Sequence, residues 1–533
     1  MPDHPSYDIA EEPCLPIRTG RRHEQVGMRE LFLRAHTIDD LALTIPPAAS
    51  ATLRVLAVIA ARLTTTPGGP GLDDPELSAE QWTARRQELL HHPQGFDPKT
   101  VHAYFNAHPL DLLHPTRPFL QDPALADQCP TTSGINTLVF GRPAGNNLAW
   151  LSPHTDTDPQ PVPCDEALWH LLAQHYYGPA GSCTPRTVAG QTSGTGTAGP
   201  LRSTISFHPL GRTLYETLLL NAPKYTGDWP DLPDTCPWEE PQAPDPQAPQ
   251  HPLTWPGRLL TGRSRHAILL IPTSDGHAIA DAYLTWATQQ PKLEATDPYL
   301  IIHTDPKKPI QQRRTPRRAD ADRAVWRDLD ALLLAGDESA TVQRPQIFDT
   351  LNDLPTDVRA ALRVRACGFD QDGKTRNRTW YTVLTPPIWT WSQENDPAMA
   401  RRIALCRAAA EEVAARLAAL AARAWQEAVT PPHGSRPRSH KVPKRVGPWV
   451  TASHTAYWPR AEATFWRLLN EDPDQPARAA FAADAVTVLR EVTAPAIVQY
   501  RRAAPAVVRA VAALRAGPAP AGGRGRPRRQ KAS

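Results

Sequence analysis

The spacing of apolar residues after residue 391 constrains the fold of this chain more than any other feature. Four successive segments carry apolar side chains at alternating intervals of three and four residues, which places one apolar stripe along each predicted helix. The links are short, except for a Pro-rich basic link at residues 431–448. The pattern predicts an antiparallel four-helix bundle over residues 391–516. The first stripe begins with Ile403, Cys406, Ala410 and Val413.

The remaining sequence predicts a different kind of domain. A chain of 533 residues is too long for one ordinary core, so two or more domains are expected. Residues 1–390 alternate short helical and strand patterns between Pro-rich connectors. We therefore predict an α+β protein, with a large mixed N-terminal domain of small β-sheets and helices before the bundle. Residues 517–533, rich in Gly, Pro, Ala and Arg, are predicted to form a disordered basic tail.

Charge, cysteine usage and the N-terminus narrow the class of protein. The formal net charge is only +3, so any affinity for nucleic acid must come from local clusters. The seven cysteines form no CxxC pair, which argues against a zinc site. The first residues are polar and acidic, unlike a signal peptide, and the best apolar run, residues 53–63, contains two arginines. We expect a cytoplasmic protein that contacts no membrane and holds no metal.

The stretch at residues 178–221 is the leading candidate for a binding element. Its first half, residues 178–199, is rich in Gly, Ser, Thr and Ala and contains no acidic residue. Such a backbone can approach another molecule closely and offer free N–H groups to a polyanion. We predict a flexible Gly-rich loop, anchored by an apolar strand and a short apolar element that follow it.

Within this stretch, residues 194–199 match the GxGxxG pattern of dinucleotide-binding proteins. That motif should follow a strand and open a helix, whereas Pro200 and a strand-like segment follow here. The sequence contains no GxSxG or HExxH motif and assembles no nucleophile with a base. We therefore expect a non-enzymatic protein without a cofactor.

Two further segments have compositions that suit nucleic-acid contact. Residues 362–381 predict a strand, a turn and a strand, with a polar, cationic tip. Residues 307–318 form a basic run broken by proline. Each of these alone is typical of a solvated surface loop. Together with the Gly-rich stretch and the predicted helical bundle they indicate a binding surface.

Residues 135–140 are a strand candidate, followed by a glycine-containing turn.

Several short motifs resemble the CasA family, the large subunit of the type I-E CRISPR surveillance complex Cascade. Their order and spacing hold over nearly the whole chain, although none is diagnostic alone. The motifs are RPFLQ at residues 117–121, GPAG at 178–181, GRTLYETLLLN at 211–221, LTGRSRHAILL at 260–270, RVRACGF at 363–369 and FWRLL at 465–469.

The resemblance implies a non-catalytic reader of target double-stranded DNA within an RNA-guided complex. Such a subunit recognises the protospacer-adjacent motif, largely from the minor groove, helps open the duplex and docks the helicase–nuclease effector used in antiviral defence. The division of labour is general, because the protein checks a short motif while base pairing reads the rest. Partners are then guide RNA, the other Cascade subunits, target DNA and the effector.

The resemblance also implies roles for particular residues. The family's glycine loop matches GPAG, and its wedge, a hairpin tip that separates the first base pairs, matches residues 372–376. Many relatives carry Gln at the wedge, where this chain has Gly-Lys. The family loop that contacts guide RNA matches residues 138–142. The implied DNA-binding residues are Gly178, Ala180, Gly181, Gly373, Lys374 and Arg376, and the implied RNA-binding residues are Val139, Phe140 and Arg142.

Two other functions remain open from the sequence. A phosphate-ligand-binding enzyme would use the Gly-rich loop at residues 178–199 to hold a small molecule. A purely structural subunit would bridge partners and be insensitive to changes at Lys374 and Arg376.

Overall fold

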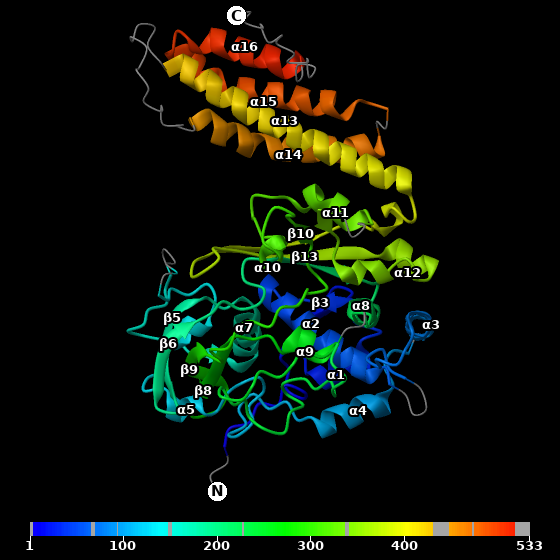
Figure 1. Cartoon of the computed structure of the whole chain (residues 1–533), viewed down its shortest axis with the longest axis vertical. Coiled ribbons are helices and arrows are strands. Elements are labelled where there is room, and N and C mark those ends of the chain that lie inside the picture. Colours follow the sequence, from blue (N-terminus) through cyan, green and yellow to red (C-terminus); the bar gives the residue numbers. More distant parts are fainter. Residues whose placement is uncertain are drawn as a thin grey trace, which may run out of the picture. The chain divides into compact units, whose positions relative to one another are not determined.

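The computed structural model describes residues 4–65, 70–92, 94–145, 147, 152–225, 229–335, 341–429, 447–471 and 474–516. Two compact units are distinguished by their internal contacts (Figure 1). The first comprises residues 1–325 and 331–396, and the second comprises residues 326–330 and the chain from residue 397. The 431–446 part of the predicted basic link and the predicted disordered tail lie outside the described residues.

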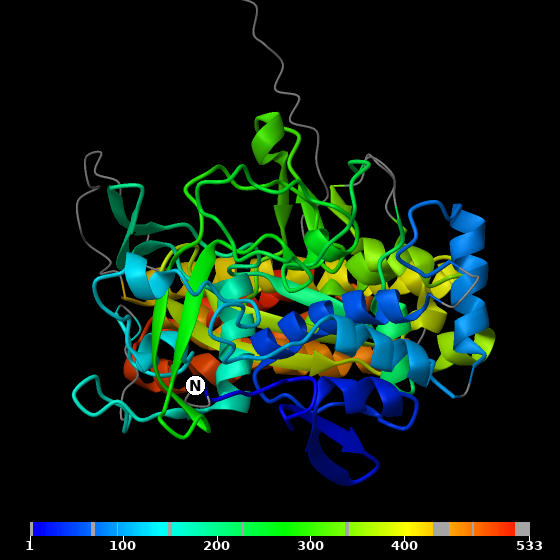
Figure 2. The same cartoon turned by 90° about the horizontal axis from the view of Figure 1, so that it is seen from below.

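The described residues of the first unit form five small antiparallel sheets, as the α+β prediction requires. Figure 2 shows the hairpin of β1 and β2, in dark blue, extending from this unit. In sheet order, the strands are β2 (Arg22–Val26), β1 (Leu15–Thr19) and β3 (Asp40–Leu41); β4 (Val162–Pro163), β9 (Ala278–Trp286) and β8 (His266–Pro272); β14 (Asn377–Leu384), β13 (Arg363–Gln371) and β7 (Ile205–Leu210); β11 (Arg314–Pro316), β10 (Ile302–Thr304) and β12 (Val342–Gln343); and β5 (Gly181–Val188) with β6 (Gln191–Gly196).

Helices connect and cover these sheets. They are α1 (Met28–Arg34), α2 (Pro46–Leu63), α3 (Ala79–Leu90), α4 (Pro98–Ala107), α5 (Leu125–Gln128), α6 (Ile135–Leu138), α7 (Cys164–Tyr177), α8 (Leu214–Asn221), α9 (Gly257–Thr261), α10 (Ile310–Arg313) and α12 (Thr356–Ala361), with 3₁₀ turns η2 (Gln346–Thr350) and η3 (Trp389–Trp391). The 3₁₀ turn η1 (Val325–Asp328) and helix α11 (Leu329–Leu333) contain residues of both units. The predicted strand at residues 135–140 is wrong, because its first four residues form α6. An isolated short apolar run does not distinguish a buried helical turn from a strand.

Helix α2 is the centre of the first unit. All of its residues except Arg62 are buried, and it packs against α7, α8, α9 and β13. A helix that is apolar around its whole circumference must be enclosed on all sides. The two arginines of this helix, Arg54 and Arg62, have separate ionic partners in the folded chain.

Arg54 of α2 is completely buried and forms an ion pair of 2.9 Å with the buried carboxylate of Asp297. Arg263 contacts the same carboxylate at 2.8 Å. The Arg54 guanidinium also donates to the hydroxyls of Ser50, in α2, and Ser206, in β7. Burial alone would raise the pKa of Asp297, but the two guanidinium groups lower it below its usual value. The carboxylate is therefore charged inside the core.

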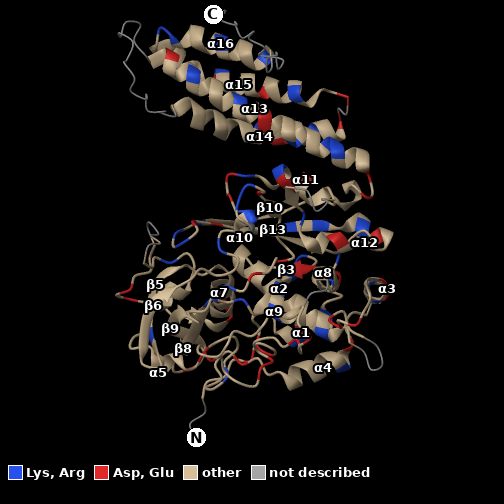
Figure 3. Ribbon diagram, in the orientation of Figure 1, with Lys and Arg blue, Asp and Glu red and all other residues tan. Residues whose placement is uncertain are grey.

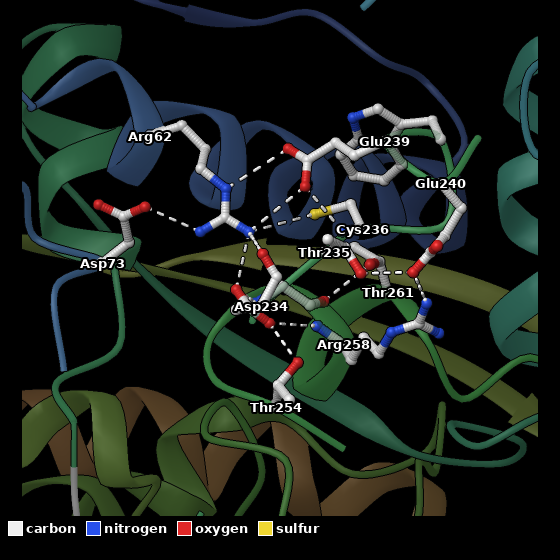
Figure 4. Close-up of polar contacts among 12 residues, drawn as sticks. Arg62, Asp73, Asp234, Thr235, Cys236, Glu239, Glu240, Thr254, Arg258 and Thr261 are labelled. Atoms are coloured by element: carbon white, nitrogen blue, oxygen red, sulfur yellow. Dashed lines mark hydrogen bonds and ion pairs between the residues drawn. The ribbon is translucent and has the colours of Figure 1, made fainter. Parts of the chain in front are cut away.

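Arg62, near the end of α2, lies among three carboxylates (Figure 4). Its guanidinium is 2.8 Å from Asp73, 2.8 Å from Asp234 and 3.4 Å from Glu239. Cys236 is fully buried beside the same guanidinium. These contacts attach the Pro-rich connector that precedes α9 to the central helix.

The second unit contains α13 (Pro397–Val429), α14 (Pro448–Asn470), α15 (Ala477–Gln499) and α16 (Ala503–Ala516). Helix α13 packs against the other three, and consecutive helices reverse direction (Figure 1). The predicted bundle is confirmed. Residues 326–330 belong to this unit, where the Arg327 guanidinium lies 3.5 Å from the ring centroid of Trp458.

Among the described residues, no helix combines the length and apolar character needed to cross a membrane.

We predict that Arg54→Met lowers the free energy of unfolding by about 3 kcal/mol, because it removes one of two cations from a buried carboxylate. Urea unfolding of the purified chain measures the change. Arg18→Met is the matched control, since the Arg18–Asp39 pair is 2.7 Å long but about 40% exposed on the arginine side. Arg18→Met should lower the free energy of unfolding by less than about 1 kcal/mol. Equal effects of the two variants would contradict the central role of Arg54.

Candidate nucleic-acid interface

The Gly-rich stretch forms a β-hairpin rather than the predicted flexible loop. Strands β5 and β6 pair from Gly181 and Gly196 at the open end to Val188 and Gln191 at the turn. The turn residues Ala189 and Gly190 have φ of 48° and 77°, as a two-residue hairpin turn requires. The hairpin rests on β9, where the Trp286 indole donates to the Ser193 carbonyl. The prediction of a loop was wrong because the many glycines obscured the strand propensity of the threonines.

Gly178 and Ala180 do not offer free backbone N–H groups, contrary to the sequence-based expectation. The Gly178 N–H donates to the carbonyl of Gln174 at the end of α7. A Cβ at Gly178 would lie 2.5 Å from the ring of His266, so close packing requires glycine here. The Ala180 N–H donates to the carbonyl of Lys374 at 2.8 Å. This last bond joins the glycine segment, residues 178–181, to the predicted wedge at residues 372–376.

Gly181 begins β5 immediately beside that contact. Its φ of +105° lies in a region that L residues rarely adopt. A Cβ on Gly181 would stand 3.4 Å from the Thr375 methyl group. The glycine segment and the tip of the β13–β14 hairpin, almost 200 residues apart in the sequence, therefore lie side by side.

The hairpin tip is held in one conformation by Asp372. Its Oδ1 accepts hydrogen bonds from the backbone N–H groups of Lys374, Thr375 and Arg376. Although desolvation acts against it, these three donors lower the pKa of the Asp372 carboxyl. Gly373, Lys374 and Arg376 are exposed around this ordered turn.

Arg202 donates hydrogen bonds to the hairpin tip and to the end of α7, directly before the glycine segment. Its side chain is 3% exposed and donates to the carbonyl groups of Tyr177, Asp372 and Arg376. It also donates to the Asn377 side chain. Burial lowers the pKa of Arg202 to about 10. One buried guanidinium thus bonds to the hairpin tip and to the last residue of α7, directly before Gly178.

His266 supports the glycine segment from β8. Its Nε2 donates to the Pro179 carbonyl at 2.9 Å, while the buried Nδ1 has no hydrogen-bond partner. A second proton would have to sit on that unpartnered nitrogen. Burial accordingly lowers the pKa of His266 to about 4.

Of the three residues expected to contact guide RNA, two are buried. Val139 and Phe140 are 5% and 6% exposed, and the Phe140 ring packs edge-on against Phe369 at 5.3 Å. Their side chains present no free face for stacking, because the chain turns into the core directly after α6. Arg142 is only partly buried, and its guanidinium donates to the Gln160 carbonyl at 2.6 Å.

The geometry gives no support to an enzyme site in the Gly-rich stretch. The GxGxxG residues lie in β6 and the turn after it, so no helix N-terminus is available to a pyrophosphate. Burial raises the pKa of the Cys236 thiol well above its usual value, which disfavours a nucleophilic thiolate beside Arg62. The described residues contain no group of His, Cys, Asp and Glu suited to a metal ion.

Sequence reasoning missed the supporting residues Arg202, Asp372 and His266. The Asp-x-x-x-Arg turn composition was a signal for Asp372, since Asp side chains commonly accept bonds from following N–H groups. Arg202 and His266 had no such signal, because their partners are distant in the sequence.

Comparisons with known proteins agree with one another. The family model of the CRISPR-associated protein Cse1 matches residues 8–494. A CRISPR-associated protein CasA/Cse1 of Thermus thermophilus is 26% identical over 379 residues, which cover 68% of each chain. A chain of a solved CRISPR RNA-guided surveillance complex is 39% identical, with a TM-score of 0.82, and the match covers 96% of this chain and 99% of that one. The structure of Thermus thermophilus CasA (Cse1), 19% identical with a TM-score of 0.70 over 96% and 99% of the two chains, shares the fold.

We predict that Arg202→Met lowers the hydrogen-exchange protection of the Ala180 amide and of the three amides bound to Asp372 by about tenfold or more, since the hairpin loses three hydrogen bonds and Tyr177 loses a fourth. Exchange measured by NMR or mass spectrometry tests this. Arg212→Met is the control, because Arg212 is 46% exposed and pairs with Glu216 and Asp357 away from the tip. Unchanged protection in Arg202→Met would contradict the assignment.

The His266 contact predicts a pH dependence of stability. In the unfolded chain His266 takes up a proton near pH 6.5, whereas in the folded chain it does so only near pH 4. The contribution of neutral His266 to the free energy of unfolding is therefore fully present above pH 6.5 and is lost as the pH decreases toward 4. His266→Gln should reduce the slope of unfolding free energy against pH by about 1.4 kcal/mol per unit in this window. Urea unfolding at several pH values measures the slope, and an unaltered slope would show that folded His266 accepts the proton.

Proposed function

Since this chain belongs to the CRISPR-associated Cse1 family, we propose that it is the large subunit of an RNA-guided CRISPR surveillance complex. In this role it binds guide RNA together with the other subunits and acts in antiviral defence. The 39% identity to a chain of such a complex, over nearly the full length of both, supports this part of the proposal. These partners place its activity in the cytoplasm.

The subunit reads the protospacer-adjacent motif of target double-stranded DNA with the glycine segment and the hairpin tip. The observation that carries this proposal is the hydrogen bond from Ala180 to Lys374, which places Gly181 next to an exposed, cationic tip. A residue without a side chain allows the backbone to approach base edges in the narrow minor groove. The code in that groove is degenerate, so tolerance of several motifs is expected.

The tip opens the duplex below the motif. Unstacking one base step costs a few kcal/mol, so a wedge must be held rigidly to convert contact into opening. Asp372 and Arg202 supply this rigidity through seven backbone and side-chain hydrogen bonds. Lys374 and Arg376 then meet phosphates, which offsets part of the cost.

Contact with guide RNA is proposed for Arg142 and the backbone of the adjacent turn, because the side chains of Val139 and Phe140 are buried. Docking of the helicase–nuclease effector also belongs to the proposed role and rests on membership of the family alone. The subunit itself performs no chemistry. The alternative of a phosphate-ligand enzyme is not supported, because the Gly178 and Ala180 amides are already bonded within the protein.

We predict that Gly181→Asp weakens motif-dependent DNA binding by at least tenfold, because it adds a side chain and a negative charge where the duplex approaches. Binding is measured with the assembled complex on targets with and without the motif. Gly20→Asp is the control: Gly20 also has a positive φ, of 60°, but no atom lies within 4 Å of its Cβ position. Both variants should still assemble with guide RNA. Normal target binding by Gly181→Asp would refute the assignment.

A further inference from the structure

A basic surface on β11 adjoins the candidate site. Strand β11 forms the edge of its sheet, and its three residues are exposed. Arg313 at the end of α10, Arg314 in β11 and Arg318 two residues after β11 are all exposed. Among the described residues, no carboxylate lies within ion-pair distance of any of them; Arg313 donates to a backbone carbonyl and Arg314 to the Gln343 side chain. Figure 3 shows Lys and Arg gathered around α10 and at the free end of the β13–β14 hairpin.

One end of this surface reaches the hairpin tip. Arg318 is bridged to Thr204, and the Ala319 N–H donates to the Ser203 carbonyl. Ser203 in turn donates from its hydroxyl to the Asp372 carbonyl at 2.8 Å. The Arg318 guanidinium lies 3.7 Å from the position that a Cβ on Gly373 would occupy. Arg318 therefore extends the cationic tip without a break.

The other end opens into a cavity of about 550 Å³, lined by Arg314 together with Arg265 and Lys292. Burial lowers the pKa of Arg265, and partial desolvation together with Arg265 lowers the pKa of Lys292. The lining contains two acidic residues, Glu294 and Asp297, and Asp297 is already paired with Arg54 and Arg263. The lining therefore carries an excess of positive charge suited to an anion.

The spacing suits a strand of nucleic acid. At about 3.3 Å per residue, Arg314 and Arg318 are separated by about 13 Å along the extended chain. A stacked strand rises about 3.4 Å per nucleotide, so the two side chains span about four nucleotides. A sugar–phosphate backbone presents anions at regular intervals over such a length, whereas a small anion would occupy only the cavity.

We propose that Arg313, Arg314 and Arg318, continuing into the cavity with Arg265 and Lys292, bind the sugar–phosphate backbone of one DNA strand after its separation at the hairpin tip. This surface is named the β11 surface. The inference rests on the proposed function, because it takes the strand from the wedge formed by Gly373 and Lys374. Part of the basic run is held in a sheet, because β11 pairs with β10.

The test uses the double variant Arg314→Glu/Arg318→Glu in the complex assembled with guide RNA and its other subunits. Arg21→Glu/Arg22→Glu is the matched control, since these arginines are exposed on the β1–β2 hairpin and the charge change is equal. We expect the β11 variant to bind motif-bearing target at least tenfold more weakly than the control does. The slope of log affinity against log salt should become shallower by about 1.4, which is two single-strand phosphate contacts.

Two further targets separate this inference from the proposed function. A target whose first base pairs beside the motif are already unpaired should show the same loss of slope, whereas a duplex without the motif should show none. Equal behaviour of the β11 variant and the control on motif-bearing and pre-opened targets would overturn the inference, as would an equal slope change on the duplex without the motif. If instead the proposed function is wrong, the Gly181→Asp variant retains normal motif-dependent DNA binding. That result is measured independently of the β11 variant.

Discussion

The ion pair between Arg54 and Asp297 is the interaction on which the first unit depends. A fully buried guanidinium is expensive to desolvate and is tolerated only when its donors are satisfied and its charge is balanced. Arg54 meets both conditions through Asp297, Ser50 and Ser206. Because these partners belong to α2, to β7 and to the chain before β10, the requirement fixes the positions of three segments at once.

The same core positions the candidate site. Strand β7, which receives a hydrogen bond from Arg54, pairs with β13 over six residue pairs. Strand β13 then continues beyond the core into the tip that Asp372 orders and Arg202 connects to the end of α7. The exposed tip is therefore the end of a strand anchored in the core, and the amides of Lys374, Thr375 and Arg376 are bonded within the protein. Such an element keeps its shape when it meets a duplex.

The division of roles within the glycine stretch follows from its contacts. Gly178 permits close packing against His266, Gly190 makes the hairpin turn, and Gly181 stands at the open end of the hairpin beside the tip. Only the last of these positions combines a missing side chain with proximity to exposed cations. The proposed reading of DNA thus depends on one glycine of the stretch, and the others serve the fold.

The sequence by itself determined the elements that depend on local pattern. The three–four spacing predicted the bundle, and the strand–turn–strand pattern at residues 362–381 corresponds to β13 and β14. Tertiary structure decided what depended on distant partners. Residues 135–138 became a helix and the glycine stretch a hairpin, because packing against the rest of the unit outweighs weak local propensity. Neither Arg202 nor His266 could be assigned from sequence, since their partners lie up to 175 residues away and only folding brings such groups together.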